Sequence, residues 1–418
     1  MKRTLTLLCI ISVITVSASF AQTVVDCNSG RFDTEVFQTL TTTTNLPYGS
    51  ALNSSGTYTQ LLLNVYEPAG DTAATRPLIV WAHGGSFVTG TRTDPDIVSL
   101  CQSFAKRGYV CASIEYRLGI PFPPSQLGAT QAVYRATQDM KAAVRYFRKD
   151  AATTNTFRID PSTIFVGGSS AGGFMALQHA YLDDASEIPA GIDTVALGNL
   201  EGNSGNPGYP SEINAVVNLC GALGDKNYLQ PGDEPLCSMH GTTDNTVPYA
   251  TSTIYLYGVY PIMVIDGSYS VNERADLIGV PNVMYTYYGA GHVPYLSNSA
   301  YMDTTVRFVS NFLYGQLGCS PTDPTPLPNT FLSTAVQDVS TASKVDVFPN
   351  PSSTTWNIHD ASGIEVVQVS DISGRVVYSN TLDKRTACSV PLDGFEKGCY
   401  LIHLITTQGI RTVKAIVN

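Results

Sequence analysis

The chain has 418 residues, of which 43% are hydrophobic, 14% charged and 10% aromatic, and its formal net charge is −10 at pH 7. This composition is typical of a globular protein and excludes extensive disorder. The acidic balance argues against nucleic acid as a partner, because binding to phosphates requires a basic surface. The length exceeds what one hydrophobic core usually fills, so two folded units are expected.

Residues 1–21 have the features of a signal peptide. A basic start, Met1 to Arg3, is followed by an apolar run from Leu5 to Val16 and by small residues up to Ala21. The apolar run is too short to span a bilayer, so we expect cleavage after Ala21 and no transmembrane segment. The protein is therefore predicted to be secreted or exposed at the cell surface.

From Arg31 to Gly318, short apolar runs alternate with amphipathic stretches. This pattern is typical of a doubly wound, mostly parallel sheet with helices on both faces, an α/β fold. The predicted strands are Thr59–Tyr66, Pro77–Ala82, Tyr109–Tyr116, Thr163–Gly168, Ile213–Leu219, Leu236–His240 and Asn282–Tyr288, and the predicted helices are Asp96–Arg107, Thr130–Arg148, Ala171–Leu182 and Tyr301–Tyr314.

The composition changes after the large unit. Residues 319–343 are rich in Pro, Thr and Ser and predict an extended linker. Residues 344–418 alternate short strands with Gly and Asp turns, which predicts a small antiparallel β-sandwich. Its expected strands are Glu365–Val369, Arg375–Tyr378, Tyr400–Thr406 and Thr412–Ile416. The predicted organisation is thus a large unit over residues 22–318, a linker and a β-sandwich.

Of the nine cysteines, only Cys9 lies in the predicted signal peptide. The even number that remains favours disulfides in an exported chain. We expect Cys27 to pair with Cys319 across the large unit and Cys388 with Cys399 in the C-terminal unit, although several could instead be buried thiols. No CxxC spacing typical of zinc sites occurs, so no metal is expected.

The strongest chemical motif is the segment Gly168–Gly172, which reads GSSAG. It follows the apolar run Ile164–Val166 and precedes a helical pattern, which is the setting of a GxSxG nucleophile elbow. The tight turn lifts the central serine above the sheet, and the helix N-terminus favours developing negative charge. The spacing predicts Ser170 as the nucleophile and rejects Ser169.

A second glycine-rich segment, His83–Phe87, reads HGGSF and follows the apolar strand Leu78–Trp81. It stands where a loop that stabilises an oxyanion should leave the sheet. The backbone N–H groups of Gly85 and Ser86, together with that of Ala171, are predicted to bind the oxyanion. The alternative is a plain turn.

The large unit offers His83, His179, His240 and His292 as a general base. His83 belongs to the glycine-rich loop, His240 ends a predicted strand, and His179 lies about 13 Å from Ser170 along one helix at 1.5 Å per residue. This leaves His292, in the glycine-rich segment after the last predicted strand.

A carboxylate is needed to orient the histidine and to stabilise its protonated form. Asp244 lies on the loop after the penultimate predicted strand, whereas Asp266, the alternative, lies on a less typical loop. The resulting order along the chain, Ser170, Asp244, His292, is that of the α/β-hydrolases.

From Leu62 to Tyr314 the sequence resembles the esterase branch of the α/β-hydrolases, close to carboxylesterases and to feruloyl or acetyl esterases with an HGG loop and a GxSAGG elbow. The resemblance implies an α/β-hydrolase fold and ester hydrolysis through an acyl-enzyme. Two residues depart from the pattern: Ser86 replaces a frequent third glycine, and Glu115 replaces a frequent asparagine in the pocket wall. No motif for a metal or a phosphate-bearing cofactor occurs, so no cofactor is implied.

The C-terminal unit resembles the type A sorting domain of the Bacteroidetes type IX secretion system. The similarity lies in Val347–Pro351 (VFPNP), Val369–Val376 (VSDISGRV), Lys397–Tyr400 (KGCY) and Lys414–Asn418 (KAIVN). It implies the secretion machinery as a partner and passage across the outer membrane. A carbohydrate-binding or immunoglobulin-like module is the alternative.

The expected substrates are small or polymer-borne esters with a short or aromatic acyl group, such as esters of plant polysaccharides. Tyrosine and phenylalanine rings near Asp244, His292 and the HGGSF loop are expected to line the mouth of the site. Asp183–Glu212 is expected to cap it. A serine peptidase, a lipase or polyester hydrolase, and a non-catalytic binding protein are the alternative functions. The tyrosine and phenylalanine residues expected at the mouth are Phe87, Tyr249, Tyr285, Tyr287, Tyr288 and Tyr295.

Overall fold

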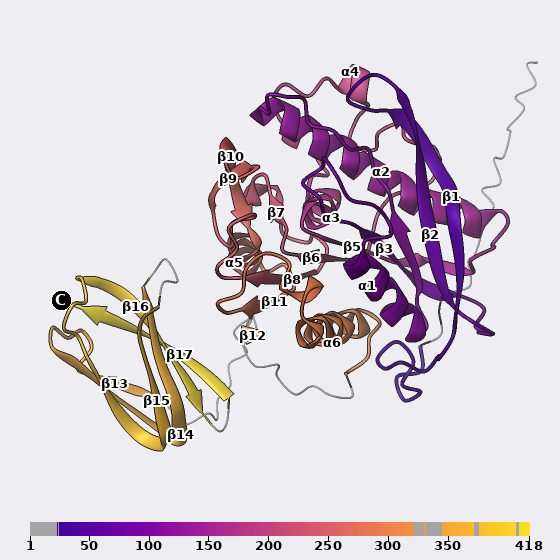
Figure 1. Cartoon of the computed structure of the whole chain (residues 1–418). Helices are drawn as coiled ribbons and strands as arrows, with labels where there is room; N and C mark the ends of the chain where they lie inside the picture. The colour runs from indigo at the N-terminus through magenta and orange to yellow at the C-terminus, as the bar shows by residue number, and fades with distance from the viewer. Residues whose placement is uncertain (1–22, 24, 322–329, 332–344, 372–375, 407–408) are drawn as a thin grey trace, which may run out of the picture. The chain divides into compact units, whose positions relative to one another are not determined.

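The computed structural model describes residues 23, 25–321, 330–331, 345–371, 376–406 and 409–418. The chain divides into two compact units, residues 1–335 and residues 336–418 (Figure 1). The predicted signal peptide and most of the predicted linker lie outside the described residues. Each unit is described by itself.

A nine-stranded sheet forms the frame of the larger unit, in the order β1-β2-β4-β3-β5-β6-β8-β11-β12 (Figure 1). The strands from β4 to β11 in this order run parallel, and antiparallel strands flank them at both edges. The strands are β1 Leu40–Leu52, β2 Tyr58–Pro68, β3 Arg76–Ala82, β4 Val110–Ile114, β5 Ile159–Ser169, β6 Ala215–Leu219, β8 Leu236–Gly241, β11 Asn282–Tyr287 and β12 Thr330–Phe331.

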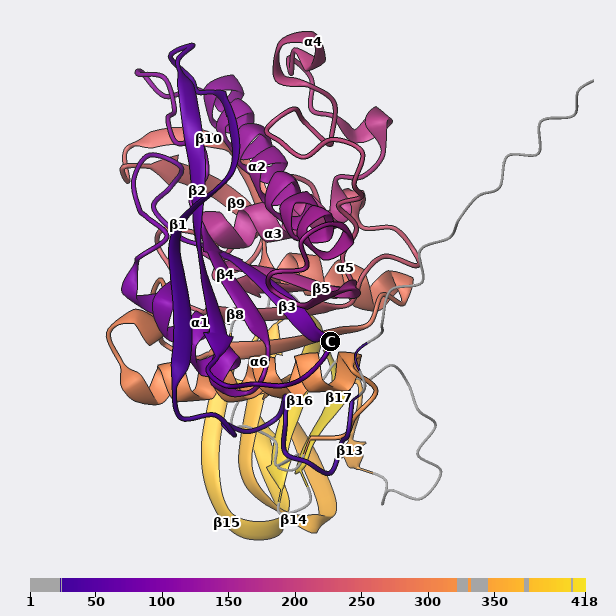
Figure 2. The ribbon, with the colours of Figure 1, turned by 90° about the vertical axis from the view of Figure 1, so that its right-hand side faces the viewer.

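Helices cover both faces of this sheet, as Figures 1 and 2 show. Helices α2 (Gln126–Ala152), α3 (Ala171–Tyr181) and α5 (Ser268–Ile278) share one hydrophobic core with the sheet. Helices α1 (Pro95–Lys106) and α6 (Ser299–Gln316) share the other. The central strands are buried along most of their length because parallel strands are covered on both faces. The doubly wound α/β prediction is confirmed.

Short helical segments lie in the loops: α4 (Thr194–Leu197) and the 3₁₀ turns η1 (Ala185–Glu187), η2 (Lys226–Tyr228) and η3 (Pro294–Leu296). A small second sheet, in the order β7-β10-β9, consists of β7 (Ala222–Leu223), β9 (Ser252–Leu256) and β10 (Tyr260–Gly267). Strands β9 and β10 form an antiparallel hairpin between β8 and α5.

The sequence analysis missed β1, the β9–β10 hairpin and α5. β1 is a polar edge strand with exposed residues along most of its length, so its apolar alternation is weak. In β10, Pro261 interrupts the run and a register shift follows it at Met263. Proline in a strand is confined to edges and bulges, which makes such a strand hard to recognise.

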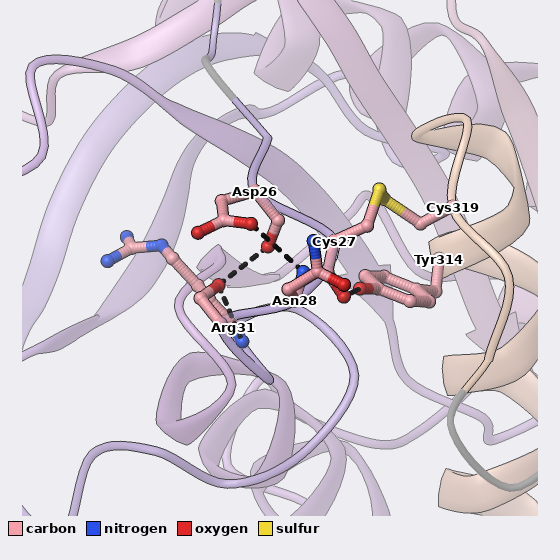
Figure 3. The surroundings of a disulfide bond; sticks show 7 residues. Asp26, Cys27, Asn28, Arg31, Tyr314 and Cys319 are labelled. Atoms are coloured by element: carbon pink, nitrogen blue, oxygen red, sulfur yellow. Dashed lines mark hydrogen bonds between the residues drawn. A yellow bond between two sulfur atoms is a disulfide. The ribbon is translucent and has the colours of Figure 1, made fainter.

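One disulfide joins the two ends of the larger unit. Cys27 is bonded to Cys319, just beyond α6, with a Cα–Cα distance of 5.5 Å (Figure 3). The Tyr314 hydroxyl, one helical turn earlier, donates to the Cys27 carbonyl oxygen at 2.7 Å. The predicted Cys27–Cys319 pair is confirmed.

The predicted Cys388–Cys399 pair is wrong, because both are free thiols. Cys388 lies opposite Ile358, near the start of strand β14, whereas Tyr400, beside Cys399, lies opposite Asp371 at its end. The two sulfurs are therefore held at opposite ends of the same strand. Among the described residues, Cys101, Cys111, Cys220 and Cys237 are also free and buried.

The smaller unit is antiparallel, as predicted. Its strands are β13 Asp346–Phe348, β14 Thr355–Asp371, β15 Val376–Pro391, β16 Gly398–Thr406 and β17 Gly409–Val417. The long β14 pairs with β13, β15 and β16, and β17 pairs with β16. Trp356, Val369 and Ile402 are among the apolar side chains that fill its separate core.

Replacing both Cys27 and Cys319 with serine should destabilise the larger unit by about 2–5 kcal/mol, because the cross-link restricts the unfolded chain. Guanidinium unfolding followed by tryptophan fluorescence measures the loss. Cys388→Ser, in the other unit, is the control and should leave the transition of the larger unit in place. Equal stability of the double variant and the parent would contradict the prediction.

Candidate active site

Ser170 lies in the turn between β5 and α3, with φ +54° and ψ −115°. A non-glycine residue rarely adopts positive φ, and such strain costs about 1–3 kcal/mol. The backbone holds the residue there: its N–H donates to the Leu219 carbonyl oxygen at 2.8 Å, and its own carbonyl oxygen accepts from Phe174 at 3.1 Å. The turn leaves the Ser170 side chain in the wall of a large cavity.

The two glycines of the motif permit this tight turn. A Cβ on Gly168 would lie 2.2 Å from the Gly172 carbonyl carbon. A Cβ on Gly172 would lie 2.0 Å from the Ala82 carbonyl oxygen at the end of β3. Both contacts are with backbone, which cannot move aside. The elbow therefore packs against β3 only because both positions lack a side chain.

The structure brings Ser170, His292 and Asp244 together in one line of hydrogen bonds. His292 Nε2 lies 2.8 Å from Ser170 Oγ, and His292 Nδ1 lies 2.6 Å from Asp244 Oδ2. The Asp244 side chain is fully buried, whereas that of His292 is 20% exposed. Ser170 follows β5, Asp244 follows β8 and His292 follows β11, so the carboxyl ends of parallel strands place the three residues together.

Asp244 is held by more than His292. Its Oδ1 accepts from the N–H groups of Thr246 at 2.8 Å and Val247 at 2.9 Å, and its Oδ2 also lies 3.1 Å from His240 Nε2. Burial alone would raise the pKa of Asp244, but the hydrogen bonds from His240 and His292 outweigh it and hold that pKa well below its usual range. The carboxylate is therefore ionised and fixed in orientation.

The alternatives considered from sequence lie elsewhere. Ser169 Oγ hydrogen-bonds Tyr295 at 2.8 Å, and Asp266 accepts from Thr251 and from the Lys226 N–H. His179 is buried under the loop that follows α3, with Nε2 2.8 Å from the Ser211 carbonyl oxygen. Among the described residues, none of these three side chains is hydrogen-bonded to Ser170 or His292.

Sequence reasoning missed the role of His240 as a second partner of Asp244. Its Nδ1 lies 2.6 Å from Ser268 Oγ, which in turn donates to Gly221. The only signal in the sequence is its position, four residues before Asp244 at the end of β8. Such a position identifies a neighbour, but it does not show which way the ring faces.

The predicted oxyanion donors lie beside the elbow. Gly85 and Ser86 have φ of +110° and +54°, and Ser86 and Ala171 line the same cavity as Ser170. A Cβ on Gly84 would lie 3.3 Å from Ser170 Cβ, so the loop passes directly over the serine. Within the described residues, no hydrogen bond uses the N–H groups of Gly85, Ser86 or Ala171.

Tyr116 and His83 fix the position of the loop that contains Gly85 and Ser86. The Tyr116 hydroxyl donates to the His83 carbonyl oxygen at 2.9 Å, and the two rings stack with centroids 4.3 Å apart. Burial lowers the pKa of His83, so its ring is neutral. Glu115, considered as part of the pocket wall, instead forms an ion pair with Arg92 outside the cavity.

The cavity beside Ser170 has a volume of about 760 Å³. Its wall comes from the start of α2, from α3, from the loop after α3 and from the β9–β10 hairpin, and it is mostly apolar. Pro189–Gly191 contribute to it, as expected of a cap, whereas Glu201 turns away to pair with Arg145 on α2 at 2.8 Å.

The prediction about aromatic rings is correct only for Phe87. Strand β11 directs Tyr285 and Tyr287 into the core on the α6 side, and Tyr295 is buried below the elbow. Tyr249 bonds Thr286 at 2.8 Å, away from the cavity. None of the five predicted tyrosines belongs to the wall of the cavity in the described structure; the rings that do are Phe87, Tyr134, Phe174, Tyr228 and Tyr255.

Cys220, Asp244 and His292 form the one group among the described residues with the donor atoms of a metal site, all within 4.8 Å of one another. A cysteine binds a metal ion as the deprotonated thiolate. Burial and the nearby Asp244 carboxylate raise the pKa of Cys220 to about 12. Asp244 and His292 already bond each other, so this donor set does not fit a resident metal.

Parts of the chain are similar to known protein families. Residues 63–225 match the family model BD-FAE, and residues 346–418 match the secretion system C-terminal sorting domain. Mouse carboxylesterase 3B is 35% identical over 133 residues, 32% of this chain and 22% of that protein. Para-nitrobenzyl esterase of Bacillus subtilis is 32% identical over 117 residues, 27% of this chain and 22% of that protein.

A solved structure of Thermogutta terrifontis esterase 2 covers 67% of this chain and 96% of its own, at 22% identity and a TM-score of 0.48. Secreted lipase 5 of Gibberella zeae is 26% identical over 215 residues, 49% of this chain and 37% of that protein. The chain spans about a fifth of the length of mouse carboxylesterase 3B.

The larger unit has the α/β-hydrolase fold. Within that fold, residues 63–225 are similar to the BD-FAE family, and the smaller unit is similar to the secretion system C-terminal sorting domain. The sorting domain indicates a secreted or cell-surface protein. Among the helices described, none combines the length and the apolar character required to cross a membrane.

Gly172→Ala should destabilise the larger unit by roughly 1–3 kcal/mol or more, because the new Cβ would overlap the backbone of β3. Gly315→Ala is the matched control: no atom lies within 4 Å of its Cβ position on α6, and alanine favours a helix by about 0.5–1 kcal/mol. Denaturant midpoints measure both. A Gly172→Ala protein as stable as the parent would show that the elbow can relax.

Proposed function

We propose that the protein is a secreted serine hydrolase that cleaves carboxylic esters through an acyl-enzyme, with Ser170 as nucleophile, His292 as general base and Asp244 as the orienting acid. The observation that carries the proposal is the continuous hydrogen-bonded line from Ser170 Oγ through His292 to the buried Asp244 carboxylate. The esterase names among the relatives agree with it.

In the first half of the reaction, Ser170 Oγ attacks the ester carbonyl carbon while His292 Nε2 takes the hydroxyl proton. Asp244 keeps the Nδ1–H of His292 directed toward itself and stabilises the imidazolium that forms. The N–H groups of Gly85, Ser86 and Ala171 bind the oxyanion, where one such donor contributes about 2.7–4 kcal/mol. His292 then gives its proton to the leaving alcohol, and Ser170 is left acylated.

In the second half, water replaces the alcohol. His292 accepts a proton from the water as it attacks the acyl carbon, and the second tetrahedral intermediate uses the same oxyanion donors. Collapse of this intermediate breaks the bond to Ser170 Oγ, which regains its proton from His292. The carboxylic acid leaves, and the chain returns to its starting state.

The cavity supports an acyl group that is short or aromatic. Its volume of about 760 Å³ lies in the range of pockets for compact organic ligands. Phe87 and Phe174 have ring centroids 6.2 Å apart in an edge-to-face arrangement near Ser170. Aromatic rings bind another ring in such geometries with about 0.5–1.5 kcal/mol beyond area burial. Esters of a plant polysaccharide are the substrates we favour.

A lipase or polyester hydrolase is the second candidate, since apolar side chains dominate the cavity wall. A serine peptidase would use the same triad, but an amide would also need polar partners beyond the scissile bond, and the wall offers few.

Ser170→Ala and His292→Ala should each lower kcat on an aryl acetate by roughly 10⁴-fold or more, and Asp244→Asn somewhat less, because triad residues act as a unit. Ser169→Ala is the control, since its hydroxyl points to Tyr295, and should keep most of the activity. Circular dichroism verifies folding. The nucleophile assignment is wrong if Ser170→Ala keeps a tenth of the parent kcat.

Along a series of p-nitrophenyl esters, kcat/KM should peak at about two to four acyl carbons, and a feruloyl ester should also be a good substrate because rings line the cavity. The series is measured at fixed pH with purified protein. A maximum at palmitate would favour the lipase reading instead.

A further inference from the structure

Apolar side chains continue from the cavity onto the surface around its mouth. Leu127 and Tyr255 line the cavity and are also 45% and 49% exposed. Phe122 is 76% exposed and packs edge-to-face on Tyr260 of the hairpin, with ring centroids 6.0 Å apart. We call Phe122, Leu127, Tyr255, Tyr257 and Val259 the apolar rim.

The turn at the tip of the β9–β10 hairpin has a residue that its backbone conformation does not favour. Tyr257 and Gly258 have φ of +55° and +71°, and the Val259 N–H donates to the Leu256 carbonyl oxygen at 3.3 Å. A two-residue turn with positive φ at both positions strongly prefers Asn-Gly. A bulky residue with positive φ is strained, and Tyr257 is nevertheless 62% exposed. Tyr257 therefore presents its ring to solvent, and the turn does not need this ring in order to fold.

The rim has no charge of its own. Between Asp244 and Asp266 the sequence contains no Asp, Glu, Lys, Arg or His. A surface that binds anionic lipid or an anionic polymer needs Lys or Arg. The chain as a whole carries a formal charge of −10, which repels such partners. The hairpin part of the rim also has no carboxylate to bind a cationic partner, so a neutral partner fits it best.

Tyrosine rings fit a neutral partner that is both apolar and hydroxylated. Each ring offers an apolar face and a hydroxyl at its edge. A sugar ring of a neutral polysaccharide likewise presents C–H faces and hydroxyl edges. The rim borders the cavity that contains Ser170, so a polymer bound there would hold its ester groups beside the nucleophile.

We propose that the apolar rim binds the neutral polysaccharide chain to which the ester group is attached. The inference rests on the proposed ester hydrolysis, and it assigns a binding partner to the β9–β10 hairpin. Extended contact along the polymer would raise the local concentration of ester at the site without changing the chemistry at Ser170.

The test replaces Tyr257 with asparagine, which suits the turn and removes the ring. Depletion by insoluble xylan measures binding, and p-nitrophenyl acetate measures activity away from the polymer. We expect roughly fivefold weaker binding to xylan, the loss of one stacked ring. The kcat/KM on the soluble ester should be unchanged, and the thermal midpoint equal or higher.

Leu277→Asn is the matched control, an apolar residue 79% exposed near the end of α5, and should change none of these values. Equal xylan binding by Tyr257→Asn and the parent would overturn the proposal, as would binding of the parent to neutral phosphatidylcholine vesicles and not to xylan. Failure of the proposed hydrolysis is seen separately, as a parent protein that binds xylan but does not cleave p-nitrophenyl acetate.

Discussion

The strained turn at Ser170 is the constraint on which the rest of the larger unit depends. A serine at φ +54° is stable only where neighbouring strands and the next helix fix its backbone, and here β6 and α3 supply both hydrogen bonds. The turn also needs glycine at positions 168 and 172, so that α3 can approach β3. A doubly wound sheet provides this support, because consecutive parallel strands end side by side at one edge. The cost of the strain is thus distributed over the core instead of being confined to the loop.

Asp244 shows how a buried carboxylate is made to serve two histidines. Two backbone N–H groups hold one oxygen, and His240 and His292 share the other. Buried charges are stable only when their hydrogen-bonding capacity is used, and here both oxygens have partners. His240 is itself held by Ser268, so it keeps Asp244 in place while His292 gains and loses a proton. The orientation of the base therefore comes from the buried Asp244 and its partners as well as from the loop in which His292 lies.

The sequence predicted those parts of the structure that are set by local pattern. The parallel strands, their helices and the motif GSSAG all have spacings that only one arrangement satisfies, and the proximity of Ser170, Asp244 and His292 follows from their positions after β5, β8 and β11. The β9–β10 hairpin escaped because Pro261 and a register shift break its alternation. The tyrosines near Asp244 and His292 were predicted to line the pocket because they are close to these residues along the chain. That prediction was wrong, since proximity along the chain does not determine which face of β11 a side chain occupies. Side-chain direction at a loop is decided by tertiary packing, which a single sequence does not reveal.

The bond between Cys27 and Cys319 also has a mechanical meaning. A load applied between residues before Cys27 and residues after Cys319 would pass directly across the two sulfurs. The sequence separation of 292 residues is then bypassed by a Cα–Cα span of 5.5 Å. The strands from β1 to β11, the elbow and the cavity lie between the two cysteines in the sequence and would be shielded from the tension. The same closeness of the two ends makes the larger unit suited to circular permutation, since a short peptide could replace the disulfide and the chain could be opened at another surface loop.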